Sequence, residues 1–227
     1  MLIILILTIY GCSKLQEDRD ISIAEAYITS TYGSNYQIIG YTPRENRASG
    51  LSPAQVKVKQ NGIEYLVDVS GGQVVGDNYS EYYAGNIVYN YILDCMQANG
   101  TLPDLSGRDV KINSQFSTIE SRESLFMVRV DCSAVRDFDE LIQAVDSAGA
   151  VYGVYFIFDI YDVSGADSED WLYDFYQTCQ EELDSYALHA NIWDSTGNTM
   201  IEQANFGEAP YLNGETLTKD EFFAKFH

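Results

Sequence analysis

The sequence predicts an α+β fold, in which small antiparallel sheets are each packed by amphipathic helices. Three observations support this prediction. Apolar and polar residues alternate along 54–60 and 63–69, and the hairpin dipeptide Asn61-Gly62 lies between them. Apolar stripes with helical spacing flank this hairpin on both sides. The hydrophobic content of 46% in 227 residues is enough for one or two substantial cores.

The first half of the chain predicts the order helix, strand, hairpin, strand, helix. Ser22 followed by Glu25 is a capping box, so the first helix is expected to start there and to end near Tyr32, before Gly33. A strand is expected at 36–41. The other elements expected here are strands at 54–60, 63–69 and 73–75 and a helix at 80–98.

This half resembles a known kind of module. The leading helix, the paired strands AQVKVKQNGIEYLVDVSGGQVVG and the glycine turn before the last strand resemble the PepSY and cystatin-like modules of small Gram-positive lipoproteins. PepSY modules are suspected of restraining peptidases, and cystatin-like modules bind proteins. The resemblance therefore implies binding rather than turnover.

The second half predicts another α+β unit. The run 151–163 is apolar on both faces until Asp159, which predicts a central strand covered on both sides. Asp137 with Glu140 predicts a helix start. The other elements expected are strands at 110–116, 125–130, 188–195 and 199–206 and helices at 169–186 and 219–226. The two halves admit one shared plan, that is, two cystatin- or PepSY-like units, although their residues show no clear repeat.

The opening stretch MLIILILTIYGC predicts export and anchoring. Its apolar run is about half of the roughly 20 residues that a membrane-spanning helix needs. Ile9-Tyr10-Gly11-Cys12 resembles a bacterial lipobox, which implies that Cys12 is lipidated and that the protein faces the extracytoplasmic side of the cell membrane. Tyr10 is bulkier than that pattern favours, and no Lys or Arg precedes the run, as a true start upstream of Met1 would explain. An uncleaved anchor and a cytosolic protein are the alternatives.

These observations divide the chain into four expected segments. They are a signal peptide at 1–11, a lipidated cysteine and tether at 12–20, a PepSY/cystatin-like domain at 21–105 and a second α+β domain at 106–227.

The charge of the chain bears on its partners. Lys and Arg number 13 against 34 Asp and Glu, which gives a formal charge of −21. Nucleic acid is excluded, because its binding depends on cations that neutralise phosphates. A basic protein partner and a simple role in solubility both fit such an acidic surface.

The cysteines do not indicate a metal site. Apart from Cys12 the chain has Cys95, Cys132 and Cys179, and no CxxC pair occurs. An extracytoplasmic location would allow a disulfide between two of the three, but no feature of the sequence requires one. No cofactor is expected either.

A catalytic centre is hard to find in the sequence. His189 lies in a predicted strand with Asn191 and Trp193, where it is expected to face solvent or an interface. The acidic stretch FDIYDVSGADSED could bind calcium, but its spacing does not match a calcium loop and a helix cap explains most of it. The alternative function is a cell-envelope hydrolase with an acidic site around Asp159 and Asp162.

Tyrosine offers a candidate binding surface. Of the 18 tyrosines, five lie in the helix expected at 80–98 or directly before it, and they cannot all lie on its apolar stripe. Tyr79, Tyr82 and Tyr89 are predicted to point away from the stripe and to bind a partner. Ordinary packing against the sheet is the alternative.

The sequence therefore predicts a lipid-anchored extracytoplasmic binding protein without enzymatic activity. Its partner would be another protein or peptide, basic in character, and the membrane would be contacted through the lipid alone. The specific version of this hypothesis is an inhibitor or immunity-like lipoprotein that acts on a secreted protein.

Overall fold

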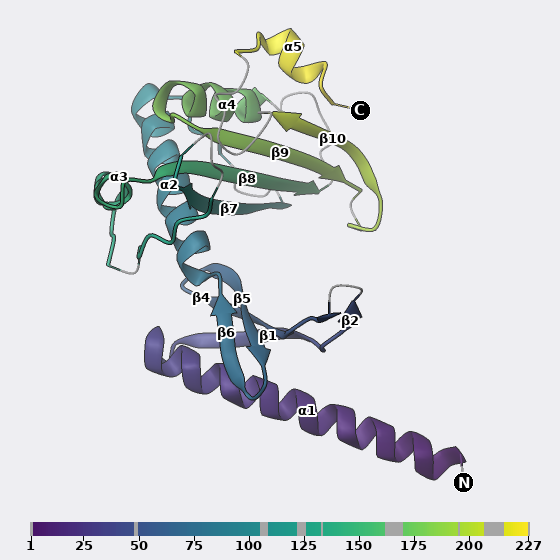
Figure 1. The fold of residues 1–227 in the computed structure, drawn as a ribbon. Helices are drawn as coiled ribbons and strands as arrows, with labels where there is room; N and C mark the ends of the chain where they lie inside the picture. The colour runs from purple at the N-terminus through teal and green to yellow at the C-terminus, as the bar shows by residue number, and fades with distance from the viewer. Residues whose placement is uncertain are drawn as a thin grey trace. The chain divides into compact units, whose positions relative to one another are not determined.

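The chain forms two compact units in the computed structural model, Met1–Tyr79 (unit 1) and Ser80–His227 (unit 2). The structure describes residues 2–47, 50–104, 109–121, 126–132, 134–161, 170–194, 196–206 and 216–226. Over these residues it contains five helices and two four-stranded sheets, mostly antiparallel (Figure 1). The predicted α+β fold class is confirmed.

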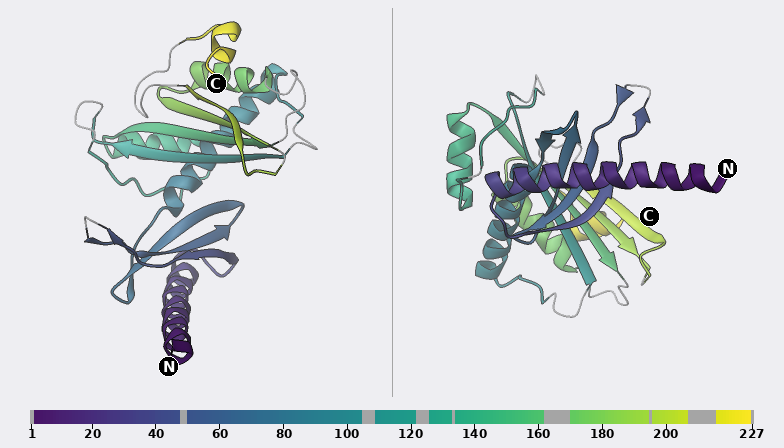
Figure 2. Two further views of the ribbon diagram at one scale, coloured as in Figure 1. Left: turned by 90° about the vertical axis from the view of Figure 1, so that its right-hand side faces the viewer. Right: turned by 90° about the horizontal axis from the view of Figure 1, so that it is seen from below.

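Unit 1 is a long helix on a four-stranded antiparallel sheet. Its elements are α1 (Leu2–Thr31), β1 (Tyr36–Thr42), β2 (Asn46–Arg47), β3 (Gly50–Leu51), β4 (Ala54–Gln60), β5 (Ile63–Ser70) and β6 (Gln73–Asp77). The sheet has the order β1-β4-β5-β6, and β2 pairs with β3 separately. The view from below in Figure 2 shows α1 running across the strands of this sheet.

The predicted hairpin of unit 1 is confirmed. Asn61 and Gly62 both have positive φ, at 53° and 81°, as a tight turn that follows the twist of its strands requires. The alternation along β4 then buries Val56 and Val58 on the face that also contains the buried Ile28 of α1.

The start of α1 corrects the sequence prediction. A non-helical tether was expected at 12–20 and a helix start at Ser22, but α1 is one helix from Leu2 to Thr31. The capping box is a local signal, and the contacts of the preceding helical turn override it.

Asp20 provides the most important of these contacts. Its side chain is fully buried and pairs with Arg44 at 3.3 Å between Oδ1 and Nη2. It also accepts hydrogen bonds from Tyr41 Oη at 3.1 Å and from Gln16 Nε2 at 2.9 Å. Because a buried carboxylate needs such partners, these contacts hold α1 against β1 and the loop after it before Ser22 is reached.

A second polar network ties the other end of α1 to the sheet. Asp77 accepts hydrogen bonds from Tyr27 Oη at 2.6 Å and from Tyr32 Oη at 2.9 Å. The ring of Tyr32 lies 4.3 Å from that of Tyr79, which in turn packs against Tyr65 at 4.9 Å. Unit 1 therefore uses these tyrosines in contacts within itself, with Tyr65 and Tyr79 buried in its core and Tyr27 and Tyr32 half-buried.

Unit 2 is a mixed sheet with helices on one face. Its elements are α2 (Tyr79–Asn99), β7 (Asp109–Ile119), α3 (Phe138–Ser147), β8 (Val151–Tyr161), α4 (Asp170–Glu182), β9 (Tyr186–Trp193), β10 (Met200–Phe206) and α5 (Lys219–Phe223). The sheet order is β10-β9-β8-β7. The β8–β9 pair is parallel, with α4 as the connection, and the other pairs are antiparallel.

The boundary between the units differs from the predicted one at 105/106. The structure divides the chain at Tyr79/Ser80, because the apolar stripe of α2 joins the core of unit 2. Gly85 shows how closely α2 approaches β7, since a Cβ at this position would lie 2.2 Å from the carbonyl oxygen of Ser114. A glycine is needed for this contact.

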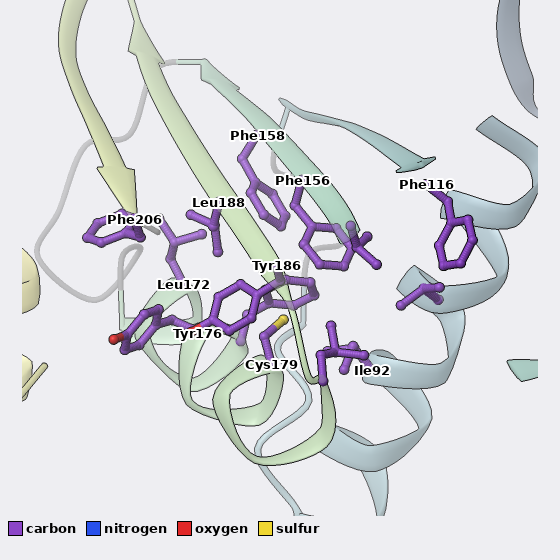
Figure 3. Packing of buried hydrophobic residues seen from close by; sticks show 14 of the residues in the cluster. Ile92, Phe116, Phe156, Phe158, Leu172, Tyr176, Cys179, Tyr186, Leu188 and Phe206 are labelled. Carbon is purple, nitrogen blue, oxygen red and sulfur yellow. The ribbon is translucent and has the colours of Figure 1, made fainter. Parts of the chain in front are cut away.

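The core of unit 2 is rich in aromatic residues. Figure 3 shows side chains from β7, β8, β9 and β10 meeting side chains from α2 and α4. The residues labelled there are Ile92, Phe116, Phe156, Phe158, Leu172, Tyr176, Cys179, Tyr186, Leu188 and Phe206. At one side the ring of Phe206 stacks on Phe222 of α5 at 4.0 Å. The predicted cap of α3 is also confirmed, since Asp137 accepts a hydrogen bond from the Glu140 amide.

Among the described residues, helices cover one face of the central strand β8, not both faces as predicted. Phe156, Phe158 and Ile160 are buried under the helices, whereas Tyr155 and Asp159 on the other side are half-buried. The prediction failed because most residues of β8 are apolar, so the sequence did not distinguish its two faces.

Three smaller predictions are also corrected. The helix expected at 169–186 ends at Glu182 as α4, and Tyr186 already begins β9. The strand expected at 125–130 is reduced, in its described part, to a single bridge between Ile119 and Met127. The two units share no strand plan, because unit 2 contains a parallel pair and unit 1 does not. The resemblance to PepSY and cystatin-like modules stays a prediction.

Among the described residues, no helix is long and apolar enough to cross a membrane.

Candidate functional site: the open face of the second sheet

Among the described residues of unit 2, no helix covers the sheet face opposite to α2 and α4, and we call this face the open face. Alternation along the strands puts on it Asp109, Lys111, Asn113, Gln115, Tyr155, Ile157, Asp159, Tyr161, His189, Asn191, Trp193, Gln203 and Asn205. Each of these side chains is half-buried or exposed, whereas Ala187, which the same alternation puts on this face, is buried. Gln115 lies at the edge of the face, since its Nε2 donates to Glu81 Oε2 of α2 at 3.0 Å. The register forms rows across the strands, one of which is Lys111, Asp159, Asn191 and Gln203.

The open face carries little charge within a very acidic unit. Unit 2 contains 26 Asp and Glu against seven Lys and Arg, a formal charge of −19. On the open face the charged side chains are Asp109, Lys111 and Asp159, beside five amides and three Tyr or Trp rings. Depletion of charge together with enrichment in Tyr and Trp is typical of the centre of a protein interface.

Asp159 is held in a fixed orientation by the neighbouring strand. Its Oδ1 accepts hydrogen bonds from Asn191 Nδ2 at 3.0 Å and from Trp193 Nε1 at 2.8 Å. Within the described part of the chain, no hydrogen bond reaches its second oxygen, Oδ2. The carboxylate therefore keeps an acceptor oxygen available next to an indole ring.

Aromatic rings lie next to this carboxylate. Tyr161 and Trp193 are nearly parallel, with ring centroids 6.5 Å apart. The Lys111 ammonium lies 4.7 Å from the centroid of Tyr161, which is a cation–π contact. Met200, the antiparallel partner of Trp193, and Ile201 are exposed, at 43% and 58%. This end of the open face is thus its aromatic end, and it also holds the three charged side chains of the face.

The centre of the open face holds the pair Tyr155 and His189. A hydrogen bond joins the Tyr155 hydroxyl to His189 Nε2, and the ring centroids are 4.6 Å apart. Burial lowers the pKa of His189 below its usual value and raises the pKa of Tyr155. Both groups are therefore neutral near pH 7, which suits hydrogen bonding more than proton transfer.

The tyrosines predicted to bind a partner do not form one surface. Tyr79 is buried in the core of unit 1, where Asn61 Nδ2 donates to its hydroxyl at 3.3 Å. Tyr89 packs against Phe175 at 5.9 Å, and burial raises the pKa of Tyr89 to about 12. Tyr82 is half-buried. The expectation that Tyr79 and Tyr89 point away from the core is thereby corrected.

The predicted acidic stretch is described in part. Asp162 and its neighbours up to residue 169 lie outside the described residues. Asp170 forms an ion pair with Lys219, with 2.9 Å between Oδ1 and Nζ. In the described part of the chain no group of three His, Cys, Asp or Glu side chains is placed to bind a metal ion.

The predicted lipidation site Cys12 lies in the first half of α1, and its lipidation stays a prediction. Cys95, Cys132 and Cys179 are free thiols. Burial raises the pKa of Cys132 to about 11 and that of Cys179 well above its usual value, so both behave as apolar side chains.

Sequence reasoning missed the open face as a site. It placed His189 with Asn191 and Trp193 and expected them to face solvent or an interface, which agrees with their half-buried state. It did not connect them with Asp159, because it took β8 to be covered on both sides. The available signal was the alternation of polar and large residues at Tyr155, Asp159 and Tyr161.

The comparisons with known proteins do not supply a family. No family model and no curated protein matches this chain. One similar solved structure is the crystal structure of a DUF5037 family protein from Ruminococcus gnavus ATCC 29149. It shares 11% identity and a TM-score of 0.38 over 78% of this chain and 76% of that one, values too low to support a functional argument.

Proposed function

We propose that this chain is a lipid-anchored extracytoplasmic binding protein without enzymatic activity, and that it binds a protein or peptide on the open face of unit 2. In its specific form the proposal describes an inhibitor or immunity-like lipoprotein that acts on a secreted protein. The observation that supports it best is the polar, aromatic and charge-poor open face within a unit of charge −19.

The proposed partner is basic at the edge of its contact surface. A charge-poor centre can bury Tyr155, His189 and the neighbouring amides at low desolvation cost, as interface centres do. The acidic surroundings attract a basic protein and speed its association. In antibody paratopes Tyr and Trp supply rigid contact area and Asn supplies adaptable hydrogen bonds, so the residue types of the open face also suit protein recognition.

The charge of unit 1 supports the anchored part of the proposal. Unit 1 contains eight Asp and Glu against six Lys and Arg, a formal charge of −2. It also contains Cys12, the proposed lipid attachment. Since anionic headgroups repel acidic surfaces, a nearly neutral unit suits the segment that follows the lipid.

The anchor is tested by Cys12→Ser. The variant should move from the membrane fraction to the soluble or secreted fraction, because the lipid supplies the membrane affinity. Retention of the variant in the membrane would refute the lipid anchor.

Binding is tested by affinity capture from native membranes and medium with three variants of the anchored chain. Trp193→Ala removes the largest ring of the open face, and Gln203→Arg places a cation on its exposed surface. Tyr82→Ala, on α2, is the matched control. Partners captured by the wild type and by Tyr82→Ala should be lost with the two open-face variants. The melting temperature of Gln203→Arg should equal that of the wild type, so that its loss of capture does not come from unfolding. Equal capture by all variants would refute the open face as the binding surface.

A further inference from the structure

The aromatic end of the open face, beside Tyr161 and Trp193, combines one oriented carboxylate with two rings. Asp159 Oδ1 is occupied by Asn191 and Trp193, whereas Oδ2 accepts no hydrogen bond from the described residues. Tyr161 and Trp193 lie nearly parallel beside it. We propose that this corner receives an arginine side chain of the partner, an inference that rests on the function proposed above and names the group it recognises.

A cationic group fits this corner because of Asp159. A half-buried carboxylate with a free oxygen gains most from a charged donor, since such hydrogen bonds are stronger than neutral ones. The surrounding unit has a formal charge of −19, so a cation is attracted from a distance as well. The two donors to Oδ1 hold the carboxylate in place before the ligand arrives, which lowers the cost of binding.

Arginine fits better than lysine because of the rings. A guanidinium is planar, so it can stack on an aromatic face while its N–H groups still donate to a carboxylate. The Lys111 ammonium over Tyr161 shows that this end of the face already accommodates a cation against a ring. No ion pair joins Lys111 to Asp159, both of which are described, so the carboxylate is not neutralised by that lysine.

A neutral saccharide is the main competing ligand. It would use the same rings, together with amides such as Asn113 and Gln203, and its binding would not depend on the charge of Asp159. The charge of that one carboxylate therefore separates the two classes of ligand.

The experiment uses the indole N–H signals of the chain's two tryptophans in ¹⁵N-labelled full-length protein. Trp193 donates to Asp159, whereas Trp171 is buried in the core and serves as an internal control. The probes are blocked pentapeptides of glycine with a central arginine, lysine or citrulline, and a neutral trisaccharide. The arginine peptide should shift the Trp193 signal saturably, leave that of Trp171 unmoved, and bind about tenfold more tightly than the citrulline peptide.

Three variants test the role of Asp159. Asp159→Asn should abolish the preference for arginine over citrulline, whereas Asp146→Asn, the same charge change at an exposed position of α3, should retain it. Lys111→Gln removes a nearby positive charge and should tighten binding of the arginine peptide about twofold. Both asparagine variants should retain the dispersion of the wild-type spectrum, which shows that they are folded.

Several results would overturn the proposal. They are equal binding of the arginine and citrulline peptides, an arginine preference that survives in Asp159→Asn, and a Trp193 shift caused by the trisaccharide but not by the arginine peptide. If partner capture depends on the open face but no peptide moves Trp193, the arginine site is rejected and the proposed function stands. If capture does not depend on the open face, the proposed function fails by its own test.

Discussion

Units 1 and 2 use their polar and aromatic residues in opposite ways. In unit 1, formal charge −2, Asp20 and Asp77 accept hydrogen bonds from tyrosines and hold α1 on the sheet. In unit 2, formal charge −19, the core is almost entirely apolar and aromatic, and polar groups such as Asp159 and His189 lie on an uncovered sheet face.

This difference separates a structural role from a binding role. Polar groups buried within a unit fix the position of its elements, because each needs its own partner. Polar groups on a half-buried surface remain available to a ligand. This difference supports the proposal that unit 1 serves anchoring and support and unit 2 recognition, and four substitutions test that division, in decreasing order of expected effect.

The largest effect is expected from Asp20→Ala in unit 1. The substitution leaves the Arg44 guanidinium without its buried partner, and its Nε already lacks one among the described residues. Loss of one member of a buried ion pair costs about 4 kcal/mol of unfolding free energy. Hydrogen exchange, measured by mass spectrometry for each unit separately, should show lost protection in unit 1.

Asp18→Asn, an exposed position in the same helix, is the control and should leave exchange unchanged. If Asp20→Ala leaves protection in unit 1 as it was, or lowers it equally in both units, the polar network does not hold unit 1 together independently of unit 2.

The next largest effect distinguishes a buried tyrosine, Tyr79, from a half-buried one, Tyr82. Tyr79→Ala removes a ring that packs against Tyr32 and Tyr65, so it should cost about 3 kcal/mol and expose unit 1 to exchange. Tyr82→Ala removes a half-buried ring and should cost less than 1 kcal/mol. Equal losses from the two substitutions in urea unfolding would contradict the different placement of these residues.

Gly85→Ala tests to which unit α2 belongs. The new Cβ would meet the Ser114 carbonyl at 2.2 Å and push α2 away from β7, so a cost of about 2 kcal/mol is expected. Tryptophan fluorescence reports on unit 2 specifically, because Trp171 and Trp193 both lie in it. Asn90→Ala, at an exposed position of α2, is the control. A loss of stability confined to unit 1 would restore the boundary predicted at 105/106.

The sequence predicted features that depend on neighbouring residues and missed features that depend on distant ones. The hairpin at Asn61-Gly62 and the cap at Asp137 depend on neighbouring residues, so they were predicted correctly. The sheet on which α2 packs depends on distant residues, since the same apolar stripe could cover either sheet. The burial of Asp20 was invisible for the same reason, because its partner Arg44 lies far along the chain.

Only part of the candidate site was predicted from the sequence, because its residues lie on two different strands. Alternation at His189, Asn191 and Trp193 indicated one exposed side of β9. Asp159 joins them through the parallel pairing of β8 with β9, which no local pattern specifies. The apolar residues of β8 gave a stronger signal than its single carboxylate and led to the expectation of two covered faces.

The smallest effect concerns His189 and tests whether the open face is partly buried in the free protein. Burial lowers the pKa of His189, so between that pKa and the usual value near 6.5 the unfolded chain binds more protons than the folded one. Stability contributed by the neutral imidazole is therefore present above about pH 6.5 and declines as the pH falls below it.

The urea midpoint of the wild type should drop more between pH 7.5 and pH 5.5 than that of His189→Gln, which can still hydrogen-bond Tyr155. His227→Gln, which changes the second of the chain's two histidines, should retain the full drop. If His189→Gln shows the same drop as the wild type, His189 is as well solvated as in the unfolded chain, and the open face is an ordinary solvated surface in the free protein.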